Sequence, residues 1–484
     1  MKPESAVLAA LLVPVLGALA IVACRRYPNL RETATLTSAA ALFLSVLTLL
    51  GPVLEGARPE VSLLQVLPGA SLAFRVEPLG MLFSLVASGL WIVNSLYSIG
   101  YMRGNRELHQ TRFYVCFALA LAFTMGVAFS ANLLTLFICY EGLTLITYPL
   151  VAHHGDEEAR RGGRTYLALL LGTSIMLLLP AVAATWITAG TLDFTPGGIL
   201  GGRLSNAAIG ALLALYVFGI GKAALMPIHR WLPAAMVAPT PVSALLHAVA
   251  VVKAGVFAVV KVIVYVFGVD AIAGLASVQW LAFASGFTII AASIIALRSN
   301  NLKRRLAYST VSQLSYVILA AALLTPLSVV GAALHIAAHA LGKITLFFAA
   351  GAIYTASHKT EVSQLDGIGR RMPWTMGAFA VGALSLIGVP PAVGFVGKWF
   401  IFQGAAASGQ YWAMAVLGAS ALLNAAYFLP IVYAAFFRAA PQGADHGEAP
   451  LSMVLALVAT STLVVVMFFY PHVPLALARQ LAGI

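Results

Sequence analysis

Five of the eight lysines lie inside long apolar stretches, where a charged side chain is out of place: Lys222, Lys253, Lys261, Lys343 and Lys398. Nearly all of the arginines lie in loops or at expected helix ends. An ionisable group at the centre of a bilayer costs about 2.5–3.5 kcal/mol on insertion scales, so each lysine needs a partner, a water-filled cavity or the loss of its proton. Lysine can lose its proton when desolvated, whereas a guanidinium stays charged. A row of buried lysines is therefore suited to holding and releasing protons.

One carboxylate lies deep in an apolar stretch, Glu141 in the run FICYEGLTLITYPL. A buried carboxylate needs a cationic partner or hydrogen bonds. A structural ion pair, or a protonated carboxyl group that joins two helices, would satisfy the same requirement. The lysines outnumber this acid, which favours a role for Glu141 in proton transfer.

Histidines accompany the lysines at helical spacing. His335, His339 and Lys343 follow each other at i, i+4 and i+8, which places them along one side of an expected helix, and His247 precedes Lys253 by six residues. Imidazole exchanges protons near neutral pH, so a proton could hop along these side chains. Any one of these histidines alone could equally be a satisfied core residue, but their position on the same helices as lysines favours a relay.

Lys261 is predicted to lie off this path. It follows Lys253 by eight residues, about two helical turns, and falls near the end of its expected helix. A lysine in that position can extend its ammonium group to the membrane interface.

The elements that must hold these side chains are membrane-spanning helices. The chain has 484 residues, of which 61% are hydrophobic and 9% charged, and its mean hydropathy is +0.95. Apolar windows of about 20 residues, enough to span a bilayer as helix, recur from end to end. We expect an all-α membrane protein, a single integral membrane domain over residues 1–484, with about fourteen transmembrane helices. Their expected centres lie near residues 14, 42, 90, 120, 142, 175, 216, 254, 287, 314, 341, 387, 424 and 463.

Positive charge sorts onto alternate loops, which sets the orientation in the membrane. Arginines and lysines follow the odd-numbered expected helices, in the ranges 25–31, 103–112, 160–164, 298–305 and 359–371. The opposite loops are nearly uncharged, so both termini are predicted to face away from the cytoplasm of a bacterial inner membrane. The first apolar stretch lacks a cleavage site and is expected to stay as a helix. The net charge of +12 follows from the loops, and nucleic acid is not expected as a partner.

Two expected helices are interrupted next to a lysine. In LYVFGIGKAALMPIHRWLP, Pro227 removes a backbone donor shortly after Lys222. In SLIGVPPAVGFVGKWFIF, Pro390 and Pro391 precede Lys398, so freed carbonyl groups can solvate an ion at membrane depth. The two interruptions are five helices apart. Because five is an odd number of membrane crossings, the second interrupted segment runs through the membrane in the opposite direction to the first.

This spacing predicts two inverted five-helix repeats, formed by the fourth to eighth and the ninth to thirteenth helices. The expected boundaries are residues 1–105 for the first three helices, 110–270 and 272–438 for the two repeats, and 450–476 for the last helix. Helix-breaking prolines also occur in ordinary membrane bundles, so the pattern alone does not fix the function.

Several blocks of sequence resemble the antiporter-like subunits shared by respiratory complex I, Mrp-type cation/proton antiporters and membrane-bound hydrogenases. The blocks are Tyr140-Glu141-Gly-Leu, Gly221-Lys222 with Pro227 and Trp231-Leu-Pro, Ala238-Pro-Thr-Pro-Val-Ser-Ala-Leu-Leu-His247, His339 to Lys343 with Leu-Phe-Phe-Ala-Ala-Gly, and Gly394-Phe-Val-Gly-Lys398. The resemblance runs from about residue 70 to about residue 430. Lys398 stands where one complex I branch has glutamate, and nothing after the last expected helix resembles the long lateral-helix extension of the largest subunits, which favours the Mrp D-type branch or its closest complex I relative.

The resemblance implies a fourteen-helix fold with two inverted repeats. It implies a proton path formed by Glu141, Lys222, His247, Lys253, His335, His339, Lys343 and Lys398. In this path Glu141 pairs with Lys222. Our hypothesis is that weakening of the pair pushes the proton of Lys222 toward Lys253, His339, Lys343 and Lys398. Lys398 is the terminal site.

We therefore expect a proton-translocating subunit of a multi-subunit cation/proton antiporter of the Mrp D type, with sodium or potassium as candidate counter-ions. The alternative is a proton-pumping subunit of a complex I-type NADH:quinone oxidoreductase or of a membrane-bound hydrogenase. The sequence contains no nucleotide-binding loop, flavin motif or metal cluster, and its three cysteines have no paired spacing. No cofactor and no catalytic site of its own are expected. The expected partners are other membrane subunits and the lipid bilayer.

Two unrelated functions also use buried histidines or lysines. His335 and His339 could be haem ligands of a membrane cytochrome, but residues four apart share a helix face and cannot bind opposite sides of one haem; a Soret band would decide. A carrier of organic anions could use the interrupted helices and their lysines, and uptake assays in membrane vesicles would distinguish it.

Overall fold

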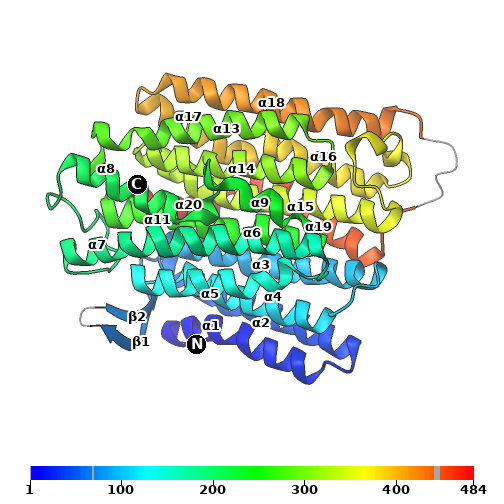
Figure 1. Cartoon of the computed structure of the whole chain (residues 1–484), viewed down its shortest axis with the longest axis horizontal. Helices are drawn as coiled ribbons and strands as arrows, with labels where there is room; N and C mark the ends of the chain where they lie inside the picture. Colours follow the sequence, from blue (N-terminus) through cyan, green and yellow to red (C-terminus); the bar gives the residue numbers. More distant parts are fainter. Residues whose placement is uncertain (1, 68–69, 441–446) are drawn as a thin grey trace.

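The computed structural model describes residues 2–67, 70–440 and 447–484 as a mostly helical bundle (Figure 1). The first part contains α1 (Pro3–Ala23), α2 (Pro28–Leu54), β1 (Glu60–Leu67), β2 (Ala70–Arg75), α3 (Pro78–Gly104), α4 (Gln110–Ala128), α5 (Leu133–Val151), α6 (Glu157–Thr173), η1 (Ser174–Leu178) and α7 (Leu179–Ala189). The middle part contains α8 (Asn206–Gly219), η2 (Gly221–Ala223), η3 (Ile228–Arg230), α9 (Trp231–Ala234), η4 (Ala235–Val237), α10 (Thr240–Ala244), η5 (Leu245–Val249), α11 (Val251–Val262), η6 (Ile263–Phe267), α12 (Val269–Ile272) and η7 (Ala276–Val278). The last part contains α13 (Trp280–Arg298), α14 (Leu302–Ala322), α15 (Pro326–Ser357), η8 (Val362–Gln364), η9 (Ile368–Arg370), α16 (Pro373–Ile387), α17 (Gly394–Ala407), α18 (Tyr411–Phe437), α19 (Leu451–Phe469) and α20 (His472–Ala482).

Eleven helical stretches within the described ranges are long and apolar enough to cross a membrane. Two shorter apolar helices, α8 and α16, each end at an interruption. The helices run side by side along the long axis of the molecule (Figure 1). The expected multi-span helical fold is confirmed, whereas the count of fourteen helices, the two inverted repeats and the domain boundaries stay predictions.

One short segment of this mostly helical chain forms strands that the sequence analysis did not predict. β1 and β2 form an antiparallel hairpin in which Glu60 pairs with Arg75 and Val61 with Phe74. Pairing continues beyond the hairpin, since Phe74 also forms an isolated antiparallel bridge with Ser130. A search for apolar windows of about 20 residues passes over strands of eight and six residues, which is why the hairpin was not expected.

The first interruption begins where α8 ends at Gly219. Lys222 lies in η2, a single 3-10 turn, and Ala224 after it adopts a left-handed φ of 55°. Pro227 lies between η2 and η3, so the chain passes through short turns before α10 begins. Backbone groups are thereby released from helical hydrogen bonds beside Lys222.

The second interruption separates α16 from α17. Gly388 follows the last residue of α16 with a φ of 90°, which L side chains rarely adopt, and a Cβ there would lie 2.6 Å from the Cδ of Lys398. Pro390 and Pro391 occupy the gap between the helices. Only glycine allows the Lys398 side chain to lie this close to the end of α16.

The two most buried spans carry most of the predicted path. The 32-residue α15 is buried over the whole of its most apolar window, and the continuous stretch from α10 to η6 is nearly as buried. These spans hold His247, Lys253, His335, His339 and Lys343, each of which is at most 1% exposed. The helices α2 and α18 are much less buried, over only 28% and 33% of their most apolar windows.

Candidate functional site

Lys253 and His339 form the centre of the site. Lys253, on α11, is hydrogen-bonded through Nζ to Nδ1 of His339 on α15. Both side chains are buried, so the bond is shielded from solvent. Such a bond needs one donor and one acceptor, so it forms either between an ammonium and a neutral imidazole or between a neutral amine and an Nδ1–H group. The two residues can therefore share a proton.

One arm runs from His339 toward Lys398. The His335 ring lies 6.2 Å from the His339 ring, centroid to centroid. Nε2 of His335 lies 3.0 Å from Oε1 of Gln313, and the Gln313 amide donates to the carbonyl of Leu386 at 3.4 Å. Because Gln313 offers an oxygen, His335 Nε2 carries the hydrogen and its Nδ1 is left as a proton acceptor.

A second arm runs from Lys343. Its Nζ donates to Ser309 Oγ at 2.8 Å, and the Tyr427 hydroxyl lies 2.9 Å from the same oxygen. Tyr427 also donates to Oδ1 of Asn424, whose amide nitrogen donates to the Leu386 carbonyl at 3.3 Å. The two arms therefore meet at one carbonyl group at the end of α16.

Lys398 lies at this meeting point. Its Nζ donates to the carbonyls of Leu386 and Ile387, the latter at 3.1 Å, and lies 4.7 Å from the ring centroid of Tyr316. These carbonyls belong to the last turn of α16, which the interruption leaves without helical partners. Within the described ranges no carboxylate lies within 4.0 Å of Lys398, so its amine is held by backbone carbonyls and the Tyr316 ring instead of an ion pair.

The ion pair implied between Glu141 and Lys222 is not formed in this structure. Lys222 Nζ instead donates to the Tyr140 carbonyl at 2.8 Å and to Thr144 Oγ1 at 2.5 Å, and it lies 3.1 Å from the Tyr140 ring centroid. Tyr140 and Thr144 are four residues apart and share one face of α5, whereas Glu141 lies on the next face. Both carboxylate oxygens of Glu141 are buried without a hydrogen-bond partner in the described part of the chain. The pair is therefore open.

No hydrogen bond between described residues joins Lys222 to Lys253. The two segments nevertheless pack closely, because a Cβ at Gly255 of α11 would lie 2.3 Å from the carbonyl carbon of Lys222. The backbone of the first interruption therefore packs directly against α11, the helix that carries Lys253.

His247 lies in the π turn η5, a conformation often found at functional sites. Its Nδ1 lies 3.1 Å from Thr310 Oγ1, and that hydroxyl donates to the Leu306 carbonyl. The hydroxyl hydrogen is therefore used, so Nδ1 of His247 is the donor and Nε2 is a buried acceptor.

The expectation that Lys261 reaches the membrane interface is wrong. Lys261 is fully buried, and its Nζ forms an ion pair with Glu77 at 3.0 Å. The helical chain does not end after Lys261 but continues into η6, and Glu77 at the start of α3 lies against the lysine. Glu77, which comes just before α3, was not recognised as a buried acid because it lies at a helix end in the sequence.

Several uncharged polar residues of the site were missed by the sequence reasoning. They are Thr144, Ser309, Thr310, Gln313, Asn424 and Tyr427. Gln313 and Asn424 could have been found, because an amide inside an apolar run needs a hydrogen-bonding partner.

The chain matches a known protein family over most of its length. The family described as NADH:quinone oxidoreductase/Mrp antiporter, TM, matches residues 130–423. NADH-quinone oxidoreductase subunit N of Desulforudis audaxviator is 34% identical over 382 residues, 78% of this chain and 75% of that protein. Subunit L of Rickettsia bellii is 31% identical over 72% of this chain and 54% of that protein. A probable K(+)/H(+) antiporter protein of Rhizobium meliloti is 32% identical over 69% of this chain and 33% of that protein.

Solved structures share the fold. A chain of the Mrp complex from Dietzia sp. DQ12-45-1b superposes with a TM-score of 0.89 at 22% identity, covering 100% of this chain and 97% of that chain. A chain of the membrane-bound sulfane sulfur reductase, an archaeal respiratory membrane complex, superposes with a TM-score of 0.87 at 24% identity, covering 99% and 97%. This protein is therefore an antiporter-like membrane subunit of the NADH:quinone oxidoreductase/Mrp antiporter family.

Proposed function

We propose that the chain carries protons across a membrane along the row from Lys253 to Lys398. The observation that supports this most strongly is the chain of buried polar side chains that leads to the carbonyl binding Lys398. Hydrogen bonds join Lys343 to this carbonyl without a break. On the other arm Lys253 bonds to His339 and His335 bonds to Gln313, with the two histidine rings 6.2 Å apart between centroids. The lysines and histidines hold the transferred proton. Amide groups do not titrate, so Gln313 and Asn424 orient the row, and water completes the transfer steps.

Glu141 and Lys222 act on this row through charge. Lys222 has no hydrogen bond to Lys253 in the described ranges, and its segment is packed against α11 at Gly255. Closing the pair neutralises the Lys222 ammonium, and opening it exposes that charge to Lys253 at low dielectric. An exposed positive charge favours release of the proton from Lys253 toward His339.

The chain works beside other membrane subunits, because its relatives are subunits of multi-subunit membrane complexes. We assign it to exchange of protons against sodium or potassium in an Mrp-type complex. The second candidate is a proton pump driven by electron transfer, favoured by the 34% identity to an NADH-quinone oxidoreductase subunit. We further propose that the chain lies in a bacterial inner membrane with both termini on the non-cytoplasmic side.

Proton flux in proteoliposomes that contain the intact complex tests this function. A pH-sensitive dye reports the flux driven by a sodium or potassium gradient, or by electron transfer. Lys253→Met removes the titratable group at similar size and is expected to lower the flux at least tenfold, while Lys2→Met at the exposed amino terminus serves as the matched control. Unchanged flux in Lys253→Met would refute the proposal. The driving force that sustains flux in the parent complex separates the two candidate functions.

A further inference from the structure

A second buried carboxylate–lysine pair lies outside the row. Lys261 Nζ lies 3.0 Å from Oε2 of Glu77, and the two residues are 0% and 4% exposed. Lys261 also donates to the carbonyl of Ser130 at 2.5 Å. The pair joins the start of α3 to the last turn of α11.

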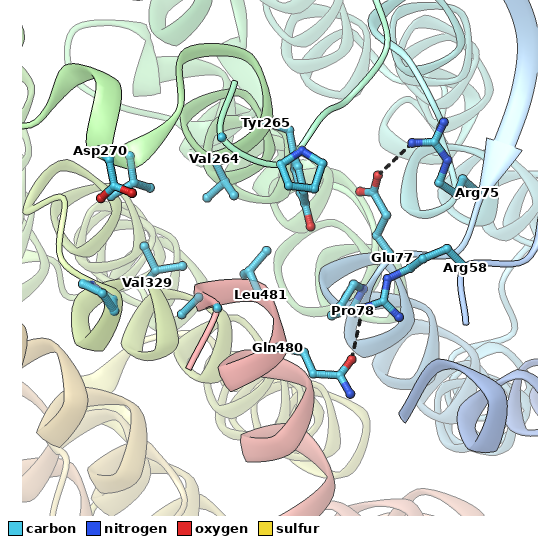
Figure 2. A pocket seen from close by; sticks show the side chains of 16 residues that line it. Arg58, Arg75, Glu77, Pro78, Val264, Tyr265, Asp270, Val329, Gln480 and Leu481 are labelled. Atoms are coloured by element: carbon cyan, nitrogen blue, oxygen red, sulfur yellow. Dashed lines mark hydrogen bonds and ion pairs between the residues drawn. The ribbon is translucent and has the colours of Figure 1, made fainter. Parts of the chain in front are cut away.

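The carboxylate of Glu77 also faces a cavity of about 500 Å³ (Figure 2). Its Oε1 lies 3.9 Å from Nη1 of Arg75, the contact drawn there as a dashed line. Arg58, Asp270 and Gln480 line the same cavity, and Asp270 is exposed at the molecular surface. A polar cavity of this size holds several water molecules. One carboxylate thus separates a water-accessible space from a fully buried amine.

Stability alone does not explain this pair. Replacing a buried ion pair by apolar side chains of similar size is often neutral or stabilising, because desolvation offsets the Coulombic attraction. The surroundings of Lys261 suit an apolar side chain, since its amine lies 4.3 and 5.5 Å from the ring centroids of Phe194 and Phe257. The titratable pair therefore points to a role that uses its charge.

α11 connects this pair to the centre of the row. Lys261 follows Lys253 by two helical turns, a rise of about 12 Å along the helix axis. Phe257 lies between them, one turn from each, and packs against Phe83 with ring centroids 5.2 Å apart. Helical side chains lean toward the amino-terminal end, so a released Lys261 side chain leans toward Lys253.

We propose that Glu77 and Lys261 form a proton gate between this cavity and the Lys253 end of the row, an inference that rests on the proposed function. A proton from cavity water binds the Glu77 carboxylate and leaves the Lys261 ammonium without its counter-charge. The ammonium releases its proton to the neutral amine of Lys253 through water admitted beside Phe257. The Glu77 carboxyl then passes its proton to the Lys261 amine, and the ion pair forms again. Each cycle moves one proton, and every step is reversible.

The gate is tested in the intact complex by proton flux in proteoliposomes together with thermal melting. Glu77→Gln and Lys261→Met each remove one titratable group, and the double variant removes both charges together. A gate requires both groups, so the two single variants and the double variant are expected to lower flux at least tenfold. A purely structural pair would behave differently, because the neutral double variant would recover both the melting temperature and the flux. Recovery of flux in the double variant overturns the proposal.

A gain of function gives a second readout. Phe257→Ala opens the space between the two lysines to water and is expected to raise the passive proton leak at least threefold. The leak should vanish when Glu77→Gln is added. A leak that persists in Phe257→Ala/Glu77→Gln, or no leak in Phe257→Ala, contradicts the gate. Glu55→Gln, which changes an exposed carboxylate at the end of α2, is the matched control and should leave flux and leak unchanged.

Failure of the gate and failure of the proposed function are distinguishable. If Lys253→Met abolishes flux while the Glu77 and Lys261 variants keep it, protons use the row but not this gate. If Lys253→Met also keeps the flux, the row itself carries no protons and both proposals fail.

Discussion

The two helix interruptions each hold one lysine, and the surroundings of the two lysines differ. Lys222 is bound by the Tyr140 carbonyl on a neighbouring helix, beside the unpartnered carboxylate of Glu141. Lys398 is bound by carbonyls of its own interruption, including that of Leu386. The first lysine can change partner, because an acid lies next to its present ligands. The second is held by fixed backbone dipoles.

The two interruptions also differ in their hydrogen bonds to the rest of the row. The carbonyl that binds Lys398 receives hydrogen bonds from Gln313 and Asn424, which end the two arms from Lys253 and Lys343. Lys222 has no such link in the described part of the chain. In the proposed function, the first interruption changes the electrostatic field at the row and the second receives a proton.

Arginine substitutions test this difference with the largest effect expected of a single substitution. Arginine keeps the positive charge but cannot release its proton. Lys398→Arg should therefore lower proton flux by about tenfold or more, whereas Lys222→Arg should lower it only about two- to fivefold because its charge can still pair with Glu141. Flux in proteoliposomes measures both variants at equal amounts of assembled complex. An equal loss in the two variants would mean that Lys222 also transfers a proton.

The two arms that meet at Leu386 provide the next test. Gln313→Leu and Asn424→Leu each remove one amide while the other arm still reaches the same carbonyl. Each single variant should lower flux about two- to threefold because the other arm remains, and the double variant about thirtyfold or more, well beyond the four- to ninefold product of two independent losses. A double-mutant cycle on flux measures this coupling. A double-variant loss equal to the product of the two single losses would show that neither arm replaces the other.

Much of this arrangement could be predicted from the sequence. Mean hydropathy and apolar windows depend only on composition along the chain, so they predicted the helical membrane fold. The lysines in the interrupted helices were found because Pro227 and the pair Pro390 and Pro391 mark each break. The sequence also placed charged residues inside apolar helices, where lysines can hold and release protons.

Pairings between distant segments could not be predicted in the same way. Whether Lys222 contacts Glu141 or Thr144 depends on the rotation of α5 about its axis, which residue spacing alone does not define. Lys261 was misplaced because the end of an apolar run was taken as the end of the buried region. Its partner Glu77 lies 184 residues earlier in the chain, and only the packing of α3 against α11 brings them together.

Two glycines test how closely each interruption is packed. A Cβ at Gly255 would lie 2.3 Å from the backbone of Lys222, whereas a Cβ at Gly342 would lie 3.2 Å from the flexible side chain of Leu386. Gly255→Ala should therefore destabilise the complex by about 1–3 kcal/mol, the usual cost of overpacking, and Gly342→Ala by much less. Melting temperatures of the purified complex measure the difference. Equal melting temperatures would show that the first interruption can shift to admit the methyl group.

A substitution at His153, which lies outside both interruptions, should have the smallest effect on proton flux and serves as a control. It lies in the loop after α5, and burial lowers its pKa from 6.5 to about 4 although the carboxylate of Glu107 lies 3.7 Å away. The unfolded chain therefore binds more protons than the folded chain between these pH values, so stability is full above pH 6.5 and falls as the pH approaches 4. His153→Gln should flatten this fall in melting temperature and leave proton flux at neutral pH unchanged. A loss of flux at neutral pH would instead link this loop to the field set by Lys222, and would extend the first interruption's influence to the membrane surface.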